Sequence, residues 1–68
     1  MNRDRVKARL GAHIRKVGGF AKVAKRVGRA ESTVRQWTLR GAKYPLPSIS
    51  MLAALRRRTG LDLNNLFA

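Results

Sequence analysis

The stretch from Phe20 to Leu39 constrains the fold of this 68-residue chain more than any other part of its sequence. Four apolar residues recur there at the spacing of one helical face: Phe20, Val23, Ala24 and Val27. Gly28 follows directly, and a residue without Cβ can turn the chain there in a left-handed conformation. Glu31 then begins a second short helix, whose inner face holds Val34 and Trp37. The pattern therefore predicts two short helices joined by a tight turn.

The residues before this stretch predict a longer helix, from Arg3 to Val17. Its apolar residues again share one face: Val6, Leu10, Ile14 and Val17. We expect Gly11 on the polar side of this helix, where glycine is less favourable than alanine by about 1 kcal/mol. His13 lies at the edge of the apolar face, and Gly18-Gly19 separates this helix from the next.

Two further helices are predicted in the second half of the chain. The helix that begins at Glu31 is expected to end over Leu39–Gly41, and two prolines predict a loop over 42–47. Pro47 suits the first turn of a fourth helix, which Gly60 ends. The inward residues of this helix are expected to be Ile49, Leu52 and Leu55. Asp62 then caps a short fifth helix.

Together these elements predict an all-α fold, a compact bundle of about five short helices that forms a single domain over residues 1–68. So short a chain buries only about 60% of the surface that its unfolded form exposes. The sequence has no cysteine, which excludes disulfides and zinc–thiolate sites. One histidine and three carboxylates supply no catalytic pair and no metal cluster, so we expect neither enzyme activity nor a cofactor.

The charge of the chain points to a polyanionic partner. Sixteen Lys and Arg against three Asp and Glu give a formal net charge of +13. Repulsion among so many like charges opposes the compact state, and a polyanion relieves it. Nucleic acid is the commonest such partner. No apolar run reaches the ~20 residues that cross a bilayer, and no signal-peptide pattern precedes the first helix, so we expect a cytoplasmic location.

The helix that begins at Glu31 also has a polar outer face. Ser32, Arg35 and Gln36 point away from the inner face, and each can hydrogen-bond to a base edge. Helix, glycine turn and a second helix with a free polar face is the helix-turn-helix arrangement of DNA-binding proteins. The sequence therefore predicts that this helix enters the major groove of DNA.

Several residues of this stretch and of the chain after it match a known family. In the central stretch they are Val23-Ala24, Gly28, Val34 and Trp37, and downstream they are Pro47-Ser48-Ile49, Leu52, Leu55, Gly60-Leu61, Leu63 and Leu66. From about Gly18 to Phe67 the chain resembles the lambda-repressor-like helix-turn-helix family, which includes phage Cro and C repressors and XRE-type regulators. Gln36-Trp37 followed by Arg40-Gly41 is similar to the Cro subgroup in particular.

The resemblance implies a five-helix domain whose third helix reads the major groove, in a phage-type repressor of the Cro kind. The base-reading positions of the family correspond to Glu31, Ser32, Thr33, Arg35 and Gln36. Phe20 stands where the family often has a phosphate-binding glutamine. Arg29 and Ala30 replace the usual apolar residue and serine of the turn, which removes the common helix cap.

Two more sets of residues are expected to contact partners. The predicted phosphate contacts are Lys22, Lys25, Arg26, Arg29, Arg40 and Lys43. Arg56-Arg57-Arg58 is either solvated or in contact with phosphate. Leu63, Leu66 and Phe67 exceed what one helical turn needs for its own docking, so we expect them to pair two copies of the chain. Such a homodimer, which could form only on DNA, reads half-sites about 34 Å apart.

Two other interpretations of the charge stay open. A sequence-neutral nucleic-acid binder, such as a nucleoid or RNA-binding protein, fits the charge equally well, although stacking aromatics are few. A cationic membrane peptide fits less well, because the turns and caps indicate a packed domain. We therefore expect a transcriptional regulator that binds a double-stranded DNA operator, with no membrane partner and no small-molecule ligand.

Overall fold

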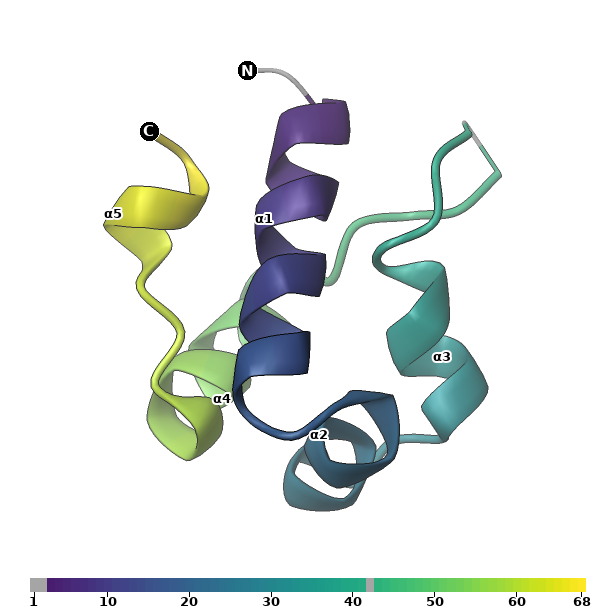
Figure 1. Cartoon of the computed structure of the whole chain (residues 1–68), viewed down its shortest axis with the longest axis vertical. Coiled ribbons are helices and arrows are strands. Elements are labelled where there is room, and N and C mark those ends of the chain that lie inside the picture. The colour runs from purple at the N-terminus through teal and green to yellow at the C-terminus, as the bar shows by residue number, and fades with distance from the viewer. Residues whose placement is uncertain (1–2, 42) are drawn as a thin grey trace.

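The computed structural model describes residues 3–41 and 43–68, and these residues form five helices (Figure 1). The helices are α1 (Arg3–Lys16), α2 (Phe20–Val27), α3 (Glu31–Gln36), α4 (Ile49–Thr59) and α5 (Leu63–Leu66). No strand occurs in the described ranges, so the predicted all-α fold with five short helices is confirmed. The predicted loop over 42–47 begins at Ala42, which lies outside the described residues.

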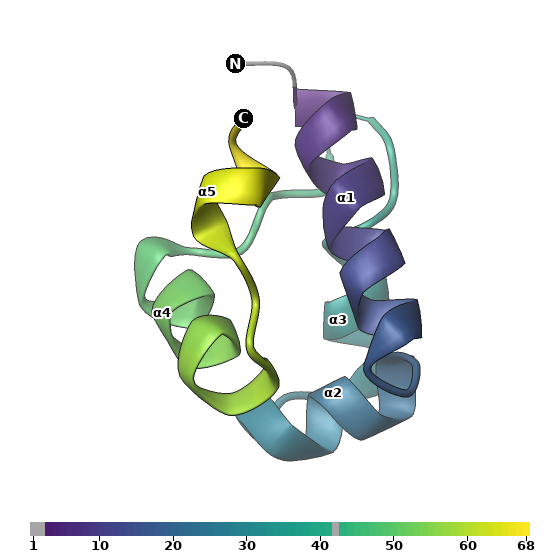
Figure 2. The ribbon, with the colours of Figure 1, turned by 60° about the vertical axis from the view of Figure 1, so that its left-hand side comes forward.

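The helices are arranged around α1. In Figure 1, α1 stands at the centre, with α5 on one side and α3 on the other. α2 crosses the lower end of α1 and packs against both α3 and α4 (Figure 2). The first turn of α1 and the short helix α5 lie together at the opposite end of the molecule. The whole domain measures 27 × 24 × 21 Å.

All five helices contribute to one hydrophobic core. Its buried residues are Val6, Leu10, Ile14, Val23, Ala24, Val34, Trp37, Met51, Leu55, Leu61 and Leu66. The predicted inner face of α3 is therefore confirmed, as are the apolar faces of α1 and α2. Phe20 and Val27 are partly buried at the margin of α2, and so is Val17, which directly follows the last residue of α1. None of the helices in the described ranges is long and apolar enough to cross a membrane.

The predicted helix ends follow local backbone chemistry. Gly28 has φ 69° and donates its N–H to the carbonyl of Ala24, and Gly60 ends α4 at φ 75°. The Asp62 carboxylate accepts from the N–H groups of the first turn of α5, as expected. The start of α4 differs from the prediction, because Ser48 caps the helix by accepting from Met51 N at 3.2 Å. Pro47 therefore precedes the helix and does not lie in its first turn.

The predicted inner face of α4 is partly wrong. Ile49 is 86% exposed, while Met51 and Leu55 are buried and Leu52 is half-buried. Ile49 precedes Leu55 by six residues, which places it about 120° around the helix from the core-facing side. Met51 precedes Leu55 by four residues and shares its face.

The prediction for Gly11 is also wrong. Gly11 is buried, and a Cβ atom at this position would meet Cγ2 of Thr38 at 3.5 Å. Lys7, one turn earlier on the same side of α1, is buried as well. α1 therefore buries a second side in addition to its apolar face, and that side packs against the chain that follows α3.

Candidate functional site

α3 has the inner and outer faces that its sequence predicts. Val34 is fully buried and Trp37, at the C-cap, is nearly so. Of the five predicted base-reading residues, four are exposed and one, Thr33, is half-buried: Glu31, Ser32, Thr33, Arg35 and Gln36. The chain turns between α2 and α3 over three residues, 28–30.

The N-terminal end of α3 has no side-chain cap. Ala30 occupies the N-cap position and accepts, through its carbonyl, from the N–H groups of Thr33 and Val34 at 3.1 and 3.2 Å. No side-chain hydrogen bond caps this end, as the departure from the family pattern predicts. Glu31 places a carboxylate in the first turn, where the helix dipole favours negative charge.

Arg35 is held by one residue from each of two helices. Its Nη2 donates to Oε1 of Glu31 at 2.8 Å, one turn earlier on α3. Its guanidinium carbon lies 4.9 Å from the centroid of the Phe20 ring, at the start of α2. Both ends of the ion pair are about half exposed, so it is worth only about 0.3–0.5 kcal/mol. The contacts therefore orient the guanidinium more than they stabilise the fold.

The contact with Phe20 could not be predicted from spacing within one helix. The Glu31–Arg35 pair follows from the i, i+4 rule, whereas the position of the Phe20 ring depends on how α2 crosses α3. Phe20 thus supplies a packing surface for the guanidinium of Arg35.

The C-terminal end of α3 is held from α1. The α-helix ends at Gln36, earlier than the predicted end over Leu39–Gly41, and tighter turns continue it to Leu39, whose N–H donates to the Gln36 carbonyl at 3.3 Å. The Lys7 ammonium donates to the carbonyls of Gln36 and Trp37, each at 3.2 Å. Lys7 is not among the site residues that the sequence predicts, because a lysine beside an apolar face usually extends to solvent.

Burial lowers the pKa of Lys7 from the ordinary lysine value, and the positive charge of Arg3 lowers this pKa further, while Asp4 opposes the shift. Desolvation disfavours the charged form of any group, so the carbonyl dipoles around the Lys7 ammonium must replace water as its solvation.

The predicted phosphate contacts are all exposed: Lys22, Lys25, Arg26, Arg29, Arg40 and Lys43. Two of them have intramolecular contacts. The ammonium of Lys43 lies 5.1 Å from the centroid of the Tyr44 ring. Nη1 of Arg26 donates to the carbonyl of Arg58 at 3.3 Å, which brings this side chain to the exposed Arg56–Arg58 run at the end of α4.

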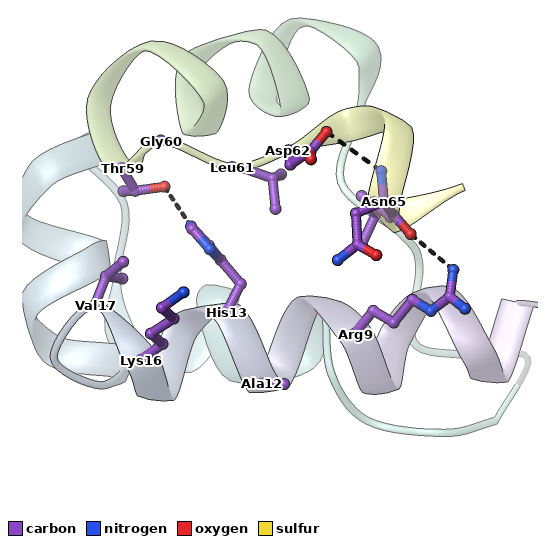
Figure 3. A pocket seen from close by; sticks show the side chains of 11 residues that line it. Arg9, Ala12, His13, Lys16, Val17, Thr59, Gly60, Leu61, Asp62 and Asn65 are labelled. Atoms are coloured by element: carbon purple, nitrogen blue, oxygen red, sulfur yellow. Dashed lines mark hydrogen bonds between the residues drawn. The ribbon is translucent and has the colours of Figure 1, made fainter. Parts of the chain in front are cut away.

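A groove of about 560 Å³ lies apart from α3, between α1 and the segment 59–66 (Figure 3). Arg9 reaches across it and donates to the carbonyls of Asn65 and Ala68 at 2.7 and 2.9 Å. Asp62, also on its wall, is engaged in capping α5. These contacts dock α5 on α1, so Arg9 and Asp62 have structural roles.

His13 makes a further contact across this groove, at the boundary position predicted for it. Its Nε2 lies 2.9 Å from Oγ1 of Thr59, and that hydroxyl donates to the carbonyl of Leu55 at 2.7 Å. Because the only hydroxyl proton is engaged there, Nε2–H of His13 is the donor. Burial, and to a lesser extent Lys16, lowers the pKa of His13. No three metal-ligating side chains gather within the described ranges.

The apolar residues expected to pair two copies of the chain differ in exposure. Leu66 is only 1% exposed and belongs to the core, so its predicted role on a surface is wrong. Leu66 is the fourth residue of α5, the helix that Asp62 caps, and its side chain faces α1. Leu63 is half-buried and Phe67 is 43% exposed. Phe67 also lines an apolar cavity of about 140 Å³ between α1, α4 and α5.

No protein-family model, no curated protein and no solved structure matches this chain. The resemblance to the lambda-repressor-like family stays a prediction from the residues.

Proposed function

We propose that this chain is a sequence-specific regulator that binds double-stranded DNA, a phage-type repressor of the Cro kind. The observation that carries the proposal is the outer face of α3, which is polar and exposed on a helix whose inner face is fixed in the core of a chain with net charge +13. α2, a three-residue turn and α3 then act as a helix-turn-helix, with α3 in the major groove. Such a protein acts in the cytoplasm of a bacterial or phage-infected cell.

Sequence reading is assigned to the predicted residues of α3. A guanidinium pairs with O6 and N7 of guanine, and a carboxamide pairs with N6 and N7 of adenine. Arg35 and Gln36 supply these groups, and both are exposed. The Glu31 carboxylate and the Phe20 ring support Arg35 from two sides, which reduces the entropy that a free guanidinium loses on binding.

Phosphate binding is assigned to exposed cations on α2 and around α3. Neutralising phosphates releases counterions, so the affinity should fall steeply with salt, with a slope near −0.9 for each phosphate contact. Replacing Lys22 and Lys25 by alanine should weaken binding to every DNA sequence alike and flatten this slope. Unchanged affinity would assign the phosphate contacts to other cations, among them Arg56–Arg58.

A second copy of the chain is needed for useful specificity, because one helix reads only a few base pairs. Phe67, which lines the apolar cavity at α5, and the half-buried Leu63 are the side chains on which two copies can pair. The pair would read two half-sites about 34 Å apart. Equal affinity for one half-site and for a full palindrome would contradict this assembly.

The alternative, a sequence-neutral nucleic-acid binder, is favoured by the charge of +13 alone. It predicts equal affinity for all duplexes of the same length, whereas the regulator predicts one preferred site. A binding-site selection from random DNA therefore separates the two functions, provided that the salt concentration is fixed.

The same selection, repeated on Arg35→Ala, tests the reading residues. We expect a loss of about 1–3 kcal/mol for the selected site, relaxed preference at one base position and a nearly unchanged salt slope. Lys25→Ala is the matched control, because it also removes one exposed positive charge but should weaken all sequences equally. An identical, equally sharp motif for wild type and Arg35→Ala would remove Arg35 from the reading face.

A further inference from the structure

Among the residues that the structure describes, Lys7 is the one charged residue that is buried, with 1% of its surface exposed. No carboxylate of the described residues lies within salt-bridge distance of its ammonium. Desolvating an uncompensated charge is unfavourable, so a buried lysine in a marginally stable domain calls for a specific reason. Such a reason is found in the atoms around Nζ.

The three partners of Lys7 Nζ are backbone carbonyls from two segments. They belong to Gln36 and Trp37, at the end of α3, and to Pro45, in the loop before α4. The donor–acceptor distances are 3.2, 3.2 and 3.5 Å. An ammonium has three N–H donors, so all three can be used. The end of a helix leaves carbonyls unpaired and carries partial negative charge, and this is an environment in which an ammonium is stabilised.

Neighbouring residues of α1 extend this contact along the same side of the helix. Arg3 Nη2 donates to the carbonyl of Tyr44 at 2.9 Å, and Gly11 leaves room for the Thr38 side chain. Arg3, Lys7 and Gly11 are spaced four residues apart, so they form one face of α1 that follows the chain from α3 to α4. Lys7 lies at its centre.

We propose that Lys7 is a positioning residue for sequence reading, which fixes the C-terminal end of α3 and thereby the direction of Arg35 and Gln36 relative to the rest of the domain. This inference rests on the proposed function of α3 as the DNA-reading helix. A neutral apolar side chain would fill the same space but leave the carbonyls of Trp37 and Pro45 without this donor. The end of α3 would then move between several arrangements.

The first test uses the free protein and no DNA. Amide hydrogen exchange is compared between wild type, Lys7→Met and the control Lys16→Met, which removes one exposed charge from the same helix. In Lys7→Met we expect exchange about tenfold faster at the N–H groups of Thr38 and Leu39, which close the last turns of α3, with a smaller change in α4. Unchanged rates, or an equal increase at every amide, would overturn the proposal. If Lys7→Met does not fold, Lys7→Gln is measured in its place. Its amide has two donors on a shorter side chain and replaces at most part of the three ammonium hydrogen bonds, so a smaller increase at the same two amides is expected.

The second test measures affinity for the selected site and for unrelated DNA of the same length. In Lys7→Met the ratio of the two affinities should fall about tenfold, while affinity for unrelated DNA should match that of Lys16→Met. Equal losses on both DNAs would show that Lys7 does not position the reading residues. A wild type without any sequence preference would contradict the proposed function, and amide exchange would still decide whether Lys7 fixes α3.

Discussion

The two ends of α3 are held in different ways. At the C-terminal end, Lys7 and Trp37 are buried, and Lys7, on α1, donates to the carbonyls of Gln36 and Trp37. At the N-terminal end, Ala30 supplies no side-chain cap, and Glu31, the first residue of the helix, pairs at the surface with Arg35 one turn later.

This difference shows how a helix of six residues can be both fixed and accessible. A short helix is marginal by itself, so its position depends on tertiary contacts. Buried contacts at one end and on the inner face fix the helix axis, while the exposed turns keep their side chains free for a partner. Changes at the C-terminal end should therefore affect stability strongly, and changes at the N-terminal end should affect it weakly.

The largest expected effect is that of Trp37→Ala at the C-terminal end. Removing a buried indole should lower the free energy of unfolding by about 3–5 kcal/mol, enough to unfold a domain of this size. Thermal and urea denaturation followed by circular dichroism measure the loss. Leu39→Ala, at a residue that is 43% exposed, is the control and should change stability by less than about 0.5 kcal/mol. Similar losses in both variants would show that burial does not distinguish this end.

The next effect is a dependence of stability on pH that originates at Lys7. Burial, with a further contribution from Arg3, lowers the Lys7 pKa in the folded state, so above that lowered pKa the unfolded chain binds more protons than the native chain. Stability that depends on Lys7 should therefore rise with pH from the lowered pKa up to about 10.4, the ordinary value of a free lysine. Urea titrations of wild type and Lys7→Met across this range isolate the contribution, since the other lysines are common to both. Parallel curves would contradict it.

A gain of roughly 0.5–1 kcal/mol is expected from Gly11→Ala, where α1 faces Thr38. Alanine is favoured over glycine within a helix by up to about 1 kcal/mol, and its methyl group would lie at an ordinary contact distance of 3.5 Å from Thr38 Cγ2. Gly18→Ala is the matched contrast, because Gly18 has φ 123° and an added Cβ would overlap the Lys22 side chain. Thermal denaturation should show opposite shifts, and a loss in Gly11→Ala would mean that Thr38 cannot accept the methyl group.

The smallest effect is expected at the N-terminal end, from Glu31→Gln. The exposed pair with Arg35 contributes about 0.3–0.5 kcal/mol, and salt should abolish the difference because exposed charges are screened. Differential scanning calorimetry at low and high salt measures both quantities. A loss above about 1 kcal/mol that persists in high salt would show that the two ends of α3 are not as different as their burial indicates.

The parts of the fold that the sequence predicts are those determined within a few neighbouring residues. The apolar face of α1, the glycine turn at Gly28 and the cap at Asp62 depend on helical spacing or on a local hydrogen bond, so each could be predicted before the structure. The exposure of Glu31 and Arg35 follows in the same way from the buried position of Val34.

The parts that the sequence does not predict depend on how helices cross. Lysine usually lies at the protein surface. Lys7 has buried hydrogen-bond acceptors because the chain from α3 to Pro45 passes beside it. The environments of Gly11 and Ile49 differ from the predicted ones because helical spacing alone does not show which sides of α1 and α4 contact a neighbouring segment.

The hydrogen bonds of Lys7 also determine whether the α2–α3 segment can keep its structure without the rest of the chain. Lys7 precedes Gln36 by 29 residues and Pro45 by 38, so the donor that completes the end of α3 comes from outside the α2–α3 segment. A graft of residues 20–39 onto another helical scaffold would transfer the side chains of α3 without the residue that holds its end. To accept the segment, the recipient helix would need a lysine that faces it and, one turn later, a residue as small as glycine or alanine. α2 and α3 are thus contiguous in sequence, but the segment that they form cannot be moved to another protein without the residue that holds the end of α3.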